Sequence, residues 1–188
     1  MLSEEINLTI EIFKEALGKA AEHLQFELTK VRTGKASPSI LLDIAVNYYG
    51  TMTPLNQVAN ISSSDARTLV IQPWEKSMLQ HIEKAIFEAN LGITPMNDGE
   101  IIRLNIPLLT EERRRDLVKQ AKNLGEDAKI SLRTARHKAL DNIKKTVKEG
   151  YPEDAGKKKE NEVQDAIAEY TKKIDHLVEA KEKDVMTV

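Results

Sequence analysis

Six cationic side chains recur at helical spacing in the middle of this chain. At about 100° per residue, they fall within an arc of about 100° on one helix and span about 30 Å of its axis. We call them the basic stripe: Arg115, Lys119, Lys122, Lys129, Arg133 and Arg136. A line of positive charge is suited to a long polyanion, because each Lys or Arg displaces a counterion from a phosphate. The pattern does not distinguish RNA from DNA.

The positive charge is concentrated in one segment of an acidic protein. The chain of 188 residues has a net charge of −2 at pH 7, whereas residues 111–148 contain twelve Lys and Arg against six Asp and Glu. A charged helix face is often only solvated surface, neutralised by acids four residues away. Here only Glu126 interrupts the basic stripe, and the other acids of the segment lie off it. The pattern therefore favours polyanion binding over simple solvation.

Three segments have the apolar spacing of long amphipathic helices. The first seam steps by four and three residues through Ile6, Ile10, Phe13, Leu17, Ala20, Leu24, Leu28 and Val31. The second helix runs from Thr110, a good N-cap, to Gly150 and carries the basic stripe opposite its own apolar residues. The third has a seam from Val163 to Leu177. Three such seams bury one another most simply as a three-helix bundle.

The stretch between the first and second helices has shorter patterns. Four strands are predicted, at residues Ile44–Tyr49, Gln57–Ile61, Thr68–Ile71 and Glu100–Leu104, with one helix at about Ser77–Asn90. Asn97-Asp98-Gly99 is a hairpin turn signal. The sequence therefore predicts an α+β protein in which residues 1–31 and 107–188 form the bundle. Residues 32–106 form a small α/β domain inserted into it, joined by hinges near 32–38 and 105–109.

Several classes of protein are excluded by what the sequence lacks. There is no cysteine, so disulfides and thiolate metal sites are ruled out. His23, His81, His137 and His176 are scattered without metal-binding or catalytic spacing, so we expect no enzyme, metal or cofactor. Trp74 is expected to pack against the protein and not to stack on a ligand. No apolar run could cross a bilayer and the N-terminus is acidic, so we expect a cytoplasmic protein.

Motifs along essentially the whole chain resemble the ribosome recycling factor family. Their order and spacing together are specific, although each one alone is weak. They are Val31-Arg32-Thr33-Gly34-Lys35-Ala36-Ser37-Pro38, Tyr48-Tyr49-Gly50-Thr51, Thr53-Pro54-Leu55, Asp65-Ala66-Arg67-Thr68-Leu69, Glu83-Lys84-Ala85-Ile86, Leu91-Gly92, Leu109-Thr110-Glu111-Glu112-Arg113-Arg114 and Arg133-Thr134-Ala135-Arg136. His137 and Lys35 stand where this family often has arginine.

The resemblance implies an L-shaped monomer that acts after translation termination. Such a factor binds large-subunit ribosomal RNA between the subunits and, with elongation factor G and GTP, splits the ribosome for reuse. Carried over to this chain, the family's RNA contacts correspond to Arg32, Arg133 and Arg136. Lys122 and Lys129 are added by their place on the basic stripe. The elbow of the family corresponds to two linkers, Arg32, Thr33, Gly34, Lys35, Ala36, Ser37 and Pro38 in one, and Asn105, Ile106 and Pro107 in the other.

One different class of function is compatible with the same helices. A coiled-coil adaptor or chaperone-like interaction protein would use the long seams to bind partner helices, and its basic stripe would be incidental. Such a protein would be indifferent to neutralisation of Arg133 and Arg136. A recycling factor would lose its binding to ribosomes.

Overall fold

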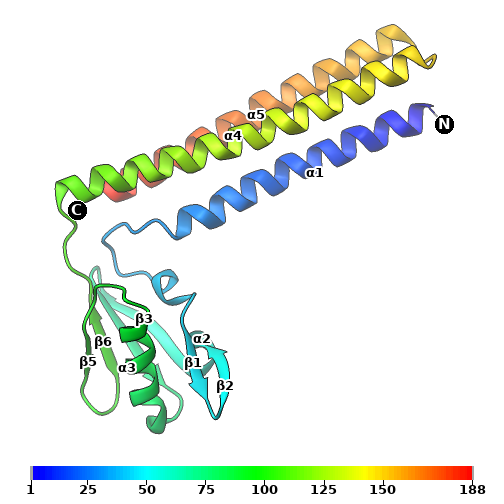
Figure 1. The fold of residues 1–188 in the computed structure, drawn as a ribbon. Coiled ribbons are helices and arrows are strands. Elements are labelled where there is room, and N and C mark those ends of the chain that lie inside the picture. The colour runs from blue at the N-terminus through cyan, green and yellow to red at the C-terminus, as the bar shows by residue number, and fades with distance from the viewer. Residues whose placement is uncertain (1, 188) are drawn as a thin grey trace. The chain divides into compact units, whose positions relative to one another are not determined.

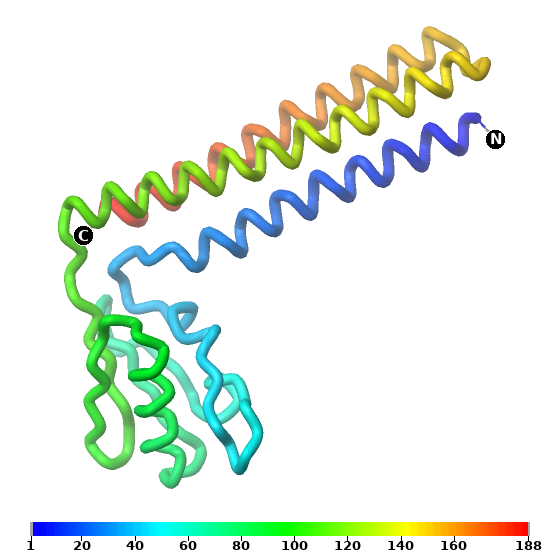
Figure 2. Tube along the Cα trace, viewed as in Figure 1, coloured from blue at the N-terminus to red at the C-terminus, as the bar shows by residue number. Residues whose placement is uncertain are grey.

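The computed structural model describes residues 2–187, which divide into two compact units. Residues 2–31 and 115–187 form one, here called the bundle unit, and Arg32–Arg114 form the other, called the small unit. The colour ramp of Figure 2 follows the chain out of the first helix, through the small unit and back into the second long helix. No helix in the described part of the chain is long and apolar enough to cross a membrane.

The bundle unit consists of three long helices that lie side by side (Figure 1). They are α1 (Leu2–Thr29), α4 (Glu111–Lys148) and α5 (Glu153–Met186). Their apolar seams form one core, in which Leu17, Ile143, Val163 and Ile174 are completely buried. The predicted three-helix bundle is confirmed. In the first seam Ala21 is more deeply buried than the predicted Ala20, because the core covers a wider face of α1 than a strict four-three repeat.

The ends of α4 follow from local side-chain and backbone chemistry. Thr110 is the N-cap, since its Oγ1 accepts a hydrogen bond from the Arg113 N–H at 3.2 Å. At the other end Gly150 has φ +112°, a conformation in which a Cβ would be strained. The Gly150 N–H donates to the Val147 carbonyl and the Tyr151 N–H to the Thr146 carbonyl, each at 3.1 Å. This terminating motif stops α4 and lets α5 return beside it.

The small unit contains an antiparallel sheet of four strands in the order β3-β4-β6-β5 and a separate hairpin, β1-β2. The strands are β1 (Ala45–Tyr48), β2 (Thr51–Pro54), β3 (Ala59–Asp65), β4 (Thr68–Pro73), β5 (Pro95–Asn97) and β6 (Ile102–Asn105). The helices are α2 (Leu55–Val58) and α3 (Leu79–Glu88), with 3-10 turns at Pro38–Leu41 and Lys76–Met78. Ile82 and Ile86 of α3 pack against Ile71 and Leu104 of the sheet in a single core.

The predicted class of the small unit, strands with one main helix, was correct, but the number and bounds of the strands were not all correct. The strand expected at Gln57–Ile61 was wrong in its first half, where α2 turns so that Leu55 and Val58 both reach the core. The strand continues instead to Asp65, because its polar end is held by backbone pairing with β4. Two short strands, β2 and β5, were missed.

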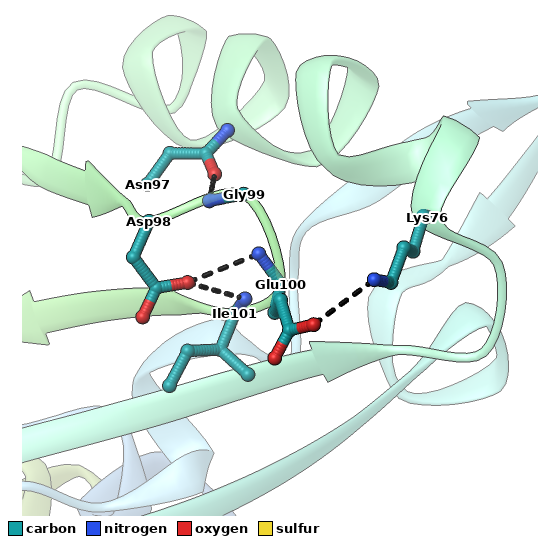
Figure 3. A network of polar contacts seen from close by, with 6 residues as sticks. All are labelled: Lys76, Asn97, Asp98, Gly99, Glu100 and Ile101. Carbon is teal, nitrogen blue, oxygen red and sulfur yellow. Dashed lines mark hydrogen bonds and ion pairs between the residues drawn. The ribbon is translucent and has the colours of Figure 1, made fainter.

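The turn between β5 and β6 shows how the predicted hairpin signal works (Figure 3). The Asp98 carboxylate accepts the Glu100 and Ile101 N–H groups at 3.0 and 2.9 Å, and the Asn97 side chain accepts the Gly99 N–H at 2.8 Å. The Glu100 and Ile101 N–H groups that donate to the Asp98 carboxylate lower its pKa below the usual 3.8, and the Ile101 N–H has the largest effect. Lys76 ties the turn to the start of α3 through Glu100 at 3.0 Å.

Candidate nucleic-acid interface

Two of the three arginines of the basic stripe, Arg133 and Arg136, are available for a ligand. Arg133 is exposed on α4, and Arg136 lies partly buried one turn further along the same face. Within residues 2–187 neither guanidinium group has an ion-pair or hydrogen-bond partner. A guanidinium group without a protein partner keeps its full donor fork for an external anion. These two residues therefore have the chemistry expected of phosphate contacts.

The two lysines that the stripe adds are used inside the bundle unit. Lys129 Nζ lies 2.7 Å from Asp175 on α5 and 3.6 Å from Glu126, and Lys122 Nζ lies 3.8 Å from Glu182 on α5. The hydrogen bond that Lys129 donates to the Asp175 carboxylate raises the pKa of Lys129 above its usual 10.5. To bind a phosphate, each ammonium group would first have to break its ion pair with a carboxylate. We therefore expect each lysine to contribute less to polyanion affinity than an unpaired arginine.

The position of the basic stripe beside α5 follows from a close approach of two helices. Gly125 lies on α4 where Val178 of α5 packs, and a Cβ on Gly125 would come within 2.6 Å of the valine methyl. This contact brings the acids of α5 within reach of Lys122 and Lys129. The two arginines that follow lie beyond the reach of those acids.

One cation on this face was missed. Lys144 follows Arg133 by eleven residues, which is about three helical turns, and is exposed on the same side of α4. It forms no ion pair with any residue in the described range. Lys122 and Lys129 are seven residues apart, so the basic stripe already contains a gap of about two turns. Allowing a similar gap after Arg136 would have added Lys144 to the stripe.

Arg32 belongs to the small unit. Its Nη1 donates to the Leu91 carbonyl at 2.8 Å, close to the end of α3. The side chain is exposed, and one bond to a neutral carbonyl leaves other donors of the guanidinium group. Arg32 therefore stays a predicted RNA contact, separate from the basic stripe.

Both predicted linkers are fastened to the turn between β3 and β4. In the first linker, the Ala36 N–H donates to the Ala66 carbonyl at 2.8 Å. In the second, the Ile106 N–H donates to the Arg67 carbonyl at 2.7 Å, and Ile106 is buried. Gly34, at φ +75°, packs against Leu109, which would lie 3.1 Å from an added Cβ. The segments Thr33–Lys35 and Pro107–Thr110 lie outside these two anchors.

Residues 2–187 contain no group of three or more His, Asp and Glu side chains that could hold a metal ion. Trp74, expected to pack and not to stack on a ligand, is 68% exposed and does not lie in the core. Its backbone N–H donates to the Val58 carbonyl at 3.0 Å.

Comparison with known proteins gives one consistent result. The family model of the ribosome recycling factor matches residues 24–186. A ribosome-recycling factor of Porphyromonas gingivalis is 57% identical over 90% of this chain and 92% of its own length. That of Flavobacterium johnsoniae is 51% identical over the full length of both chains.

Two solved structures resemble the whole chain. The solution structure of a ribosome recycling factor is 35% identical, with a TM-score of 0.80 over 98% of both chains. A second structure places the T. thermophilus recycling factor and the E. coli elongation factor G on the E. coli post-termination complex. Its recycling factor is 40% identical, with a TM-score of 0.67 over 97% of this chain and 99% of that one. Because the family model matches residues 24–186 and the Porphyromonas and Flavobacterium relatives are more than 50% identical over most of their length, the chain belongs to the ribosome recycling factor family.

Proposed function

We propose that this protein is a cytoplasmic translation factor that binds the post-termination ribosome through large-subunit RNA. With elongation factor G and GTP, it splits the ribosome into subunits for reuse. GTP is hydrolysed by the partner, and the chain itself contributes binding and force transmission. The observation that carries the proposal is the unpaired Arg133 and Arg136 on a rigid helix of a recycling-factor fold. The related structure with elongation factor G supports the choice of partners.

The stripe suits folded RNA, recognised by its backbone. Arg133 and Arg136 lie three residues apart on one face of α4. Phosphate oxygens fit the donor fork of arginine in two parallel bonds. No Phe, Tyr or Trp lies on α4, so their rings are not available there for stacking on unpaired bases. The helix is therefore built to grip phosphates along an RNA surface.

Light scattering of purified post-termination ribosomes tests the proposal. We expect the scattering to fall when this protein, elongation factor G and GTP are added together, because subunits scatter less than intact ribosomes. Omitting any one of the three should leave the signal unchanged. A coiled-coil adaptor would produce no decrease under any of these conditions, and that result would reject the proposed function.

Replacing Arg136 by lysine should impair recycling although the charge is kept. A lysine presents a point charge and cannot form two parallel bonds to one phosphate. We expect about a tenfold loss of affinity for large ribosomal subunits, corresponding to one lost charge-assisted hydrogen bond of about 1.5 kcal/mol. The affinity can be measured by co-sedimentation. Wild-type affinity in Arg136→Lys would remove the argument for a bidentate contact.

We also propose that the two linkers act as an elbow. The hydrogen bonds of Ala36 and Ile106 tie the part of each linker nearest these residues to the small unit. The proposed pivot consists of the remaining segments, Thr33–Lys35 and Pro107–Thr110. Two linkers in parallel permit hinging and oppose free rotation.

A reversible cross-link tests the elbow. The natural chain has no cysteine, so one cysteine introduced in each unit gives a single, defined link. We expect the linked protein to split ribosomes at least about tenfold more slowly while still binding large subunits, and reduction of the link to restore the rate. Undiminished splitting by the linked protein would refute the need for flexion.

A further inference from the structure

A second surface of the bundle unit lies between α1 and α4. The two helices line a groove of about 670 Å³. Its floor consists mainly of small side chains: Ala16, Ala20, Ala128, Ser131 and Ala135. From Ile12 to Leu24 of α1 the groove extends about 18 Å, which matches three turns of a helix. These small residues leave the floor recessed between the larger side chains on either side.

The borders of this groove expose large apolar side chains. Ile12 on α1 is 57% exposed and Ile130 on α4 is 53% exposed, and both line the groove. Leu8, one turn before Ile12, is 55% exposed. Phe26 is also exposed, but the Lys30 ammonium group covers its ring at 4.6 Å. A row of apolar side chains beside a concave, helix-sized surface is typical of a site where another protein binds.

The α1 border of the groove is acidic. An exposed row of glutamates lies beside Ile12: Glu4, Glu11, Glu15 and Glu22. On the groove side of α4, Asp116, Asp127 and Asp141 share the helix face with Lys138 and Lys145, so that border is close to neutral. Lys19 and Lys138 are the two cations that line the groove, and Lys19 is paired with Glu15 at 2.6 Å. A partner with positive charge beside its apolar face would be complementary.

The charge excludes the other occupants. RNA and anionic membranes are repelled by the glutamates of α1. A second copy of this chain would bring the glutamates of one α1 against those of the other. The basic stripe of a second copy has no row of large apolar side chains to fill the groove. The groove-lining side of α4 lies about 150° around the helix from the centre of the basic stripe, so both faces can be occupied together.

We propose that the α1–α4 groove binds a basic amphipathic helix of another protein. The apolar face of that helix covers Ile12 and Ile130, and its Lys or Arg residues face the glutamates of α1. This binding is separate from the contact with ribosomal RNA and does not depend on it.

A synthetic helical peptide tests the groove directly. The probe is an 18-residue peptide of leucine and lysine with leucines spaced as one helical face, and a leucine–glutamate peptide of the same pattern is the control. Each is titrated into the full ¹⁵N-labelled chain. We expect the lysine peptide to shift amide resonances of residues 8–27 and 124–138, and the glutamate peptide to shift none. Absence of binding, or shifts centred on α5 or the small unit, would overturn the proposal.

Paired variants separate the groove from non-specific attraction. Ile12→Gln/Ile130→Gln should weaken binding of the lysine peptide about tenfold, while Phe87→Gln, at a site of equal exposure on α3, should leave it unchanged. The double variant should bind large ribosomal subunits as the wild type does. Equal effects of both variants, or loss of subunit binding, would contradict a separate protein-binding face. A dimer in sedimentation equilibrium that the double variant dissolves would show that a second copy is the occupant.

Discussion

Replacing both Arg133 and Arg136 by alanine should weaken binding to large ribosomal subunits about 100-fold or more. Each guanidinium group is unpaired in the bundle unit, so each substitution removes contacts with RNA and breaks no protein ion pair. Hydrogen bonds to charged groups contribute about 1.5–3 kcal/mol each, and every 1.4 kcal/mol corresponds to a tenfold change. Co-sedimentation with purified subunits at about 0.1 M salt measures the effect, and splitting activity should fall in parallel.

The control for this pair lies on the same helix. Lys138→Ala/Lys145→Ala removes the same charge from α4, but on another face. We expect less than about a threefold change, because overall charge attracts RNA only weakly over distances longer than about 10 Å at 0.1 M salt. Equal losses in the two double variants would mean that net charge, and not the face of α4, determines binding.

Replacing Gly125 by leucine should lower the free energy of unfolding by about 3 kcal/mol. A side chain at this position must displace Val178, whose Cγ2 lies 2.6 Å from an ideal Cβ. Valine is stiff at χ1, so α5 itself must move away from α4. Chemical denaturation followed by circular dichroism measures the loss. We also expect weaker binding to ribosomes, since the separation of α4 from α5 disturbs the support of the basic stripe.

Replacing Gly18 and Gly125 by alanine, one at a time, distinguishes two effects on stability. One is the gain in helix propensity, and the other is steric crowding by the added Cβ. At Gly18 of α1 the nearest atom to an added Cβ is the Tyr170 hydroxyl at 3.9 Å, which is ordinary contact. Gly18→Ala should therefore raise the free energy of unfolding by about 0.5–1 kcal/mol. Gly125→Ala should lower it, and adding Val178→Ala should recover part of the loss. Stabilisation by Gly125→Ala would show that the helices adjust freely.

The sequence was most informative where periodicity was long. The seams around Leu17 and Ile174 repeat over many turns, so the bundle could be predicted with its helix ends, including the Thr110 cap. Short elements were harder to predict. β2 has largely exposed residues, and β5 has three residues; neither shows alternation that a pattern can detect. Their positions are determined by backbone pairing with β1 and β6, which the sequence does not display.

The position of the candidate interface could be predicted from the sequence. Whether each Lys or Arg in it forms an ion pair within the protein could not. The spacing placed Lys129 and Arg133 on one face equally. Which of them is paired depends on Asp175, a residue more than forty positions away on α5. That relation exists only after α4 and α5 pack. The α1–α4 groove was missed for a similar reason, because Ile12 and Ile130 fall outside both seams and lie along one groove only in the folded bundle unit.

The most direct test of the central claim is the salt dependence of binding to large ribosomal subunits. The claim is that phosphates of ribosomal RNA contact Arg133 and Arg136. The logarithm of the affinity should fall linearly with the logarithm of salt concentration, and Arg133→Ala/Arg136→Ala should reduce that slope by about 2, one for each lost phosphate contact. An unchanged slope in the double variant, or no association of the wild type even in dilute buffer, would contradict the claim.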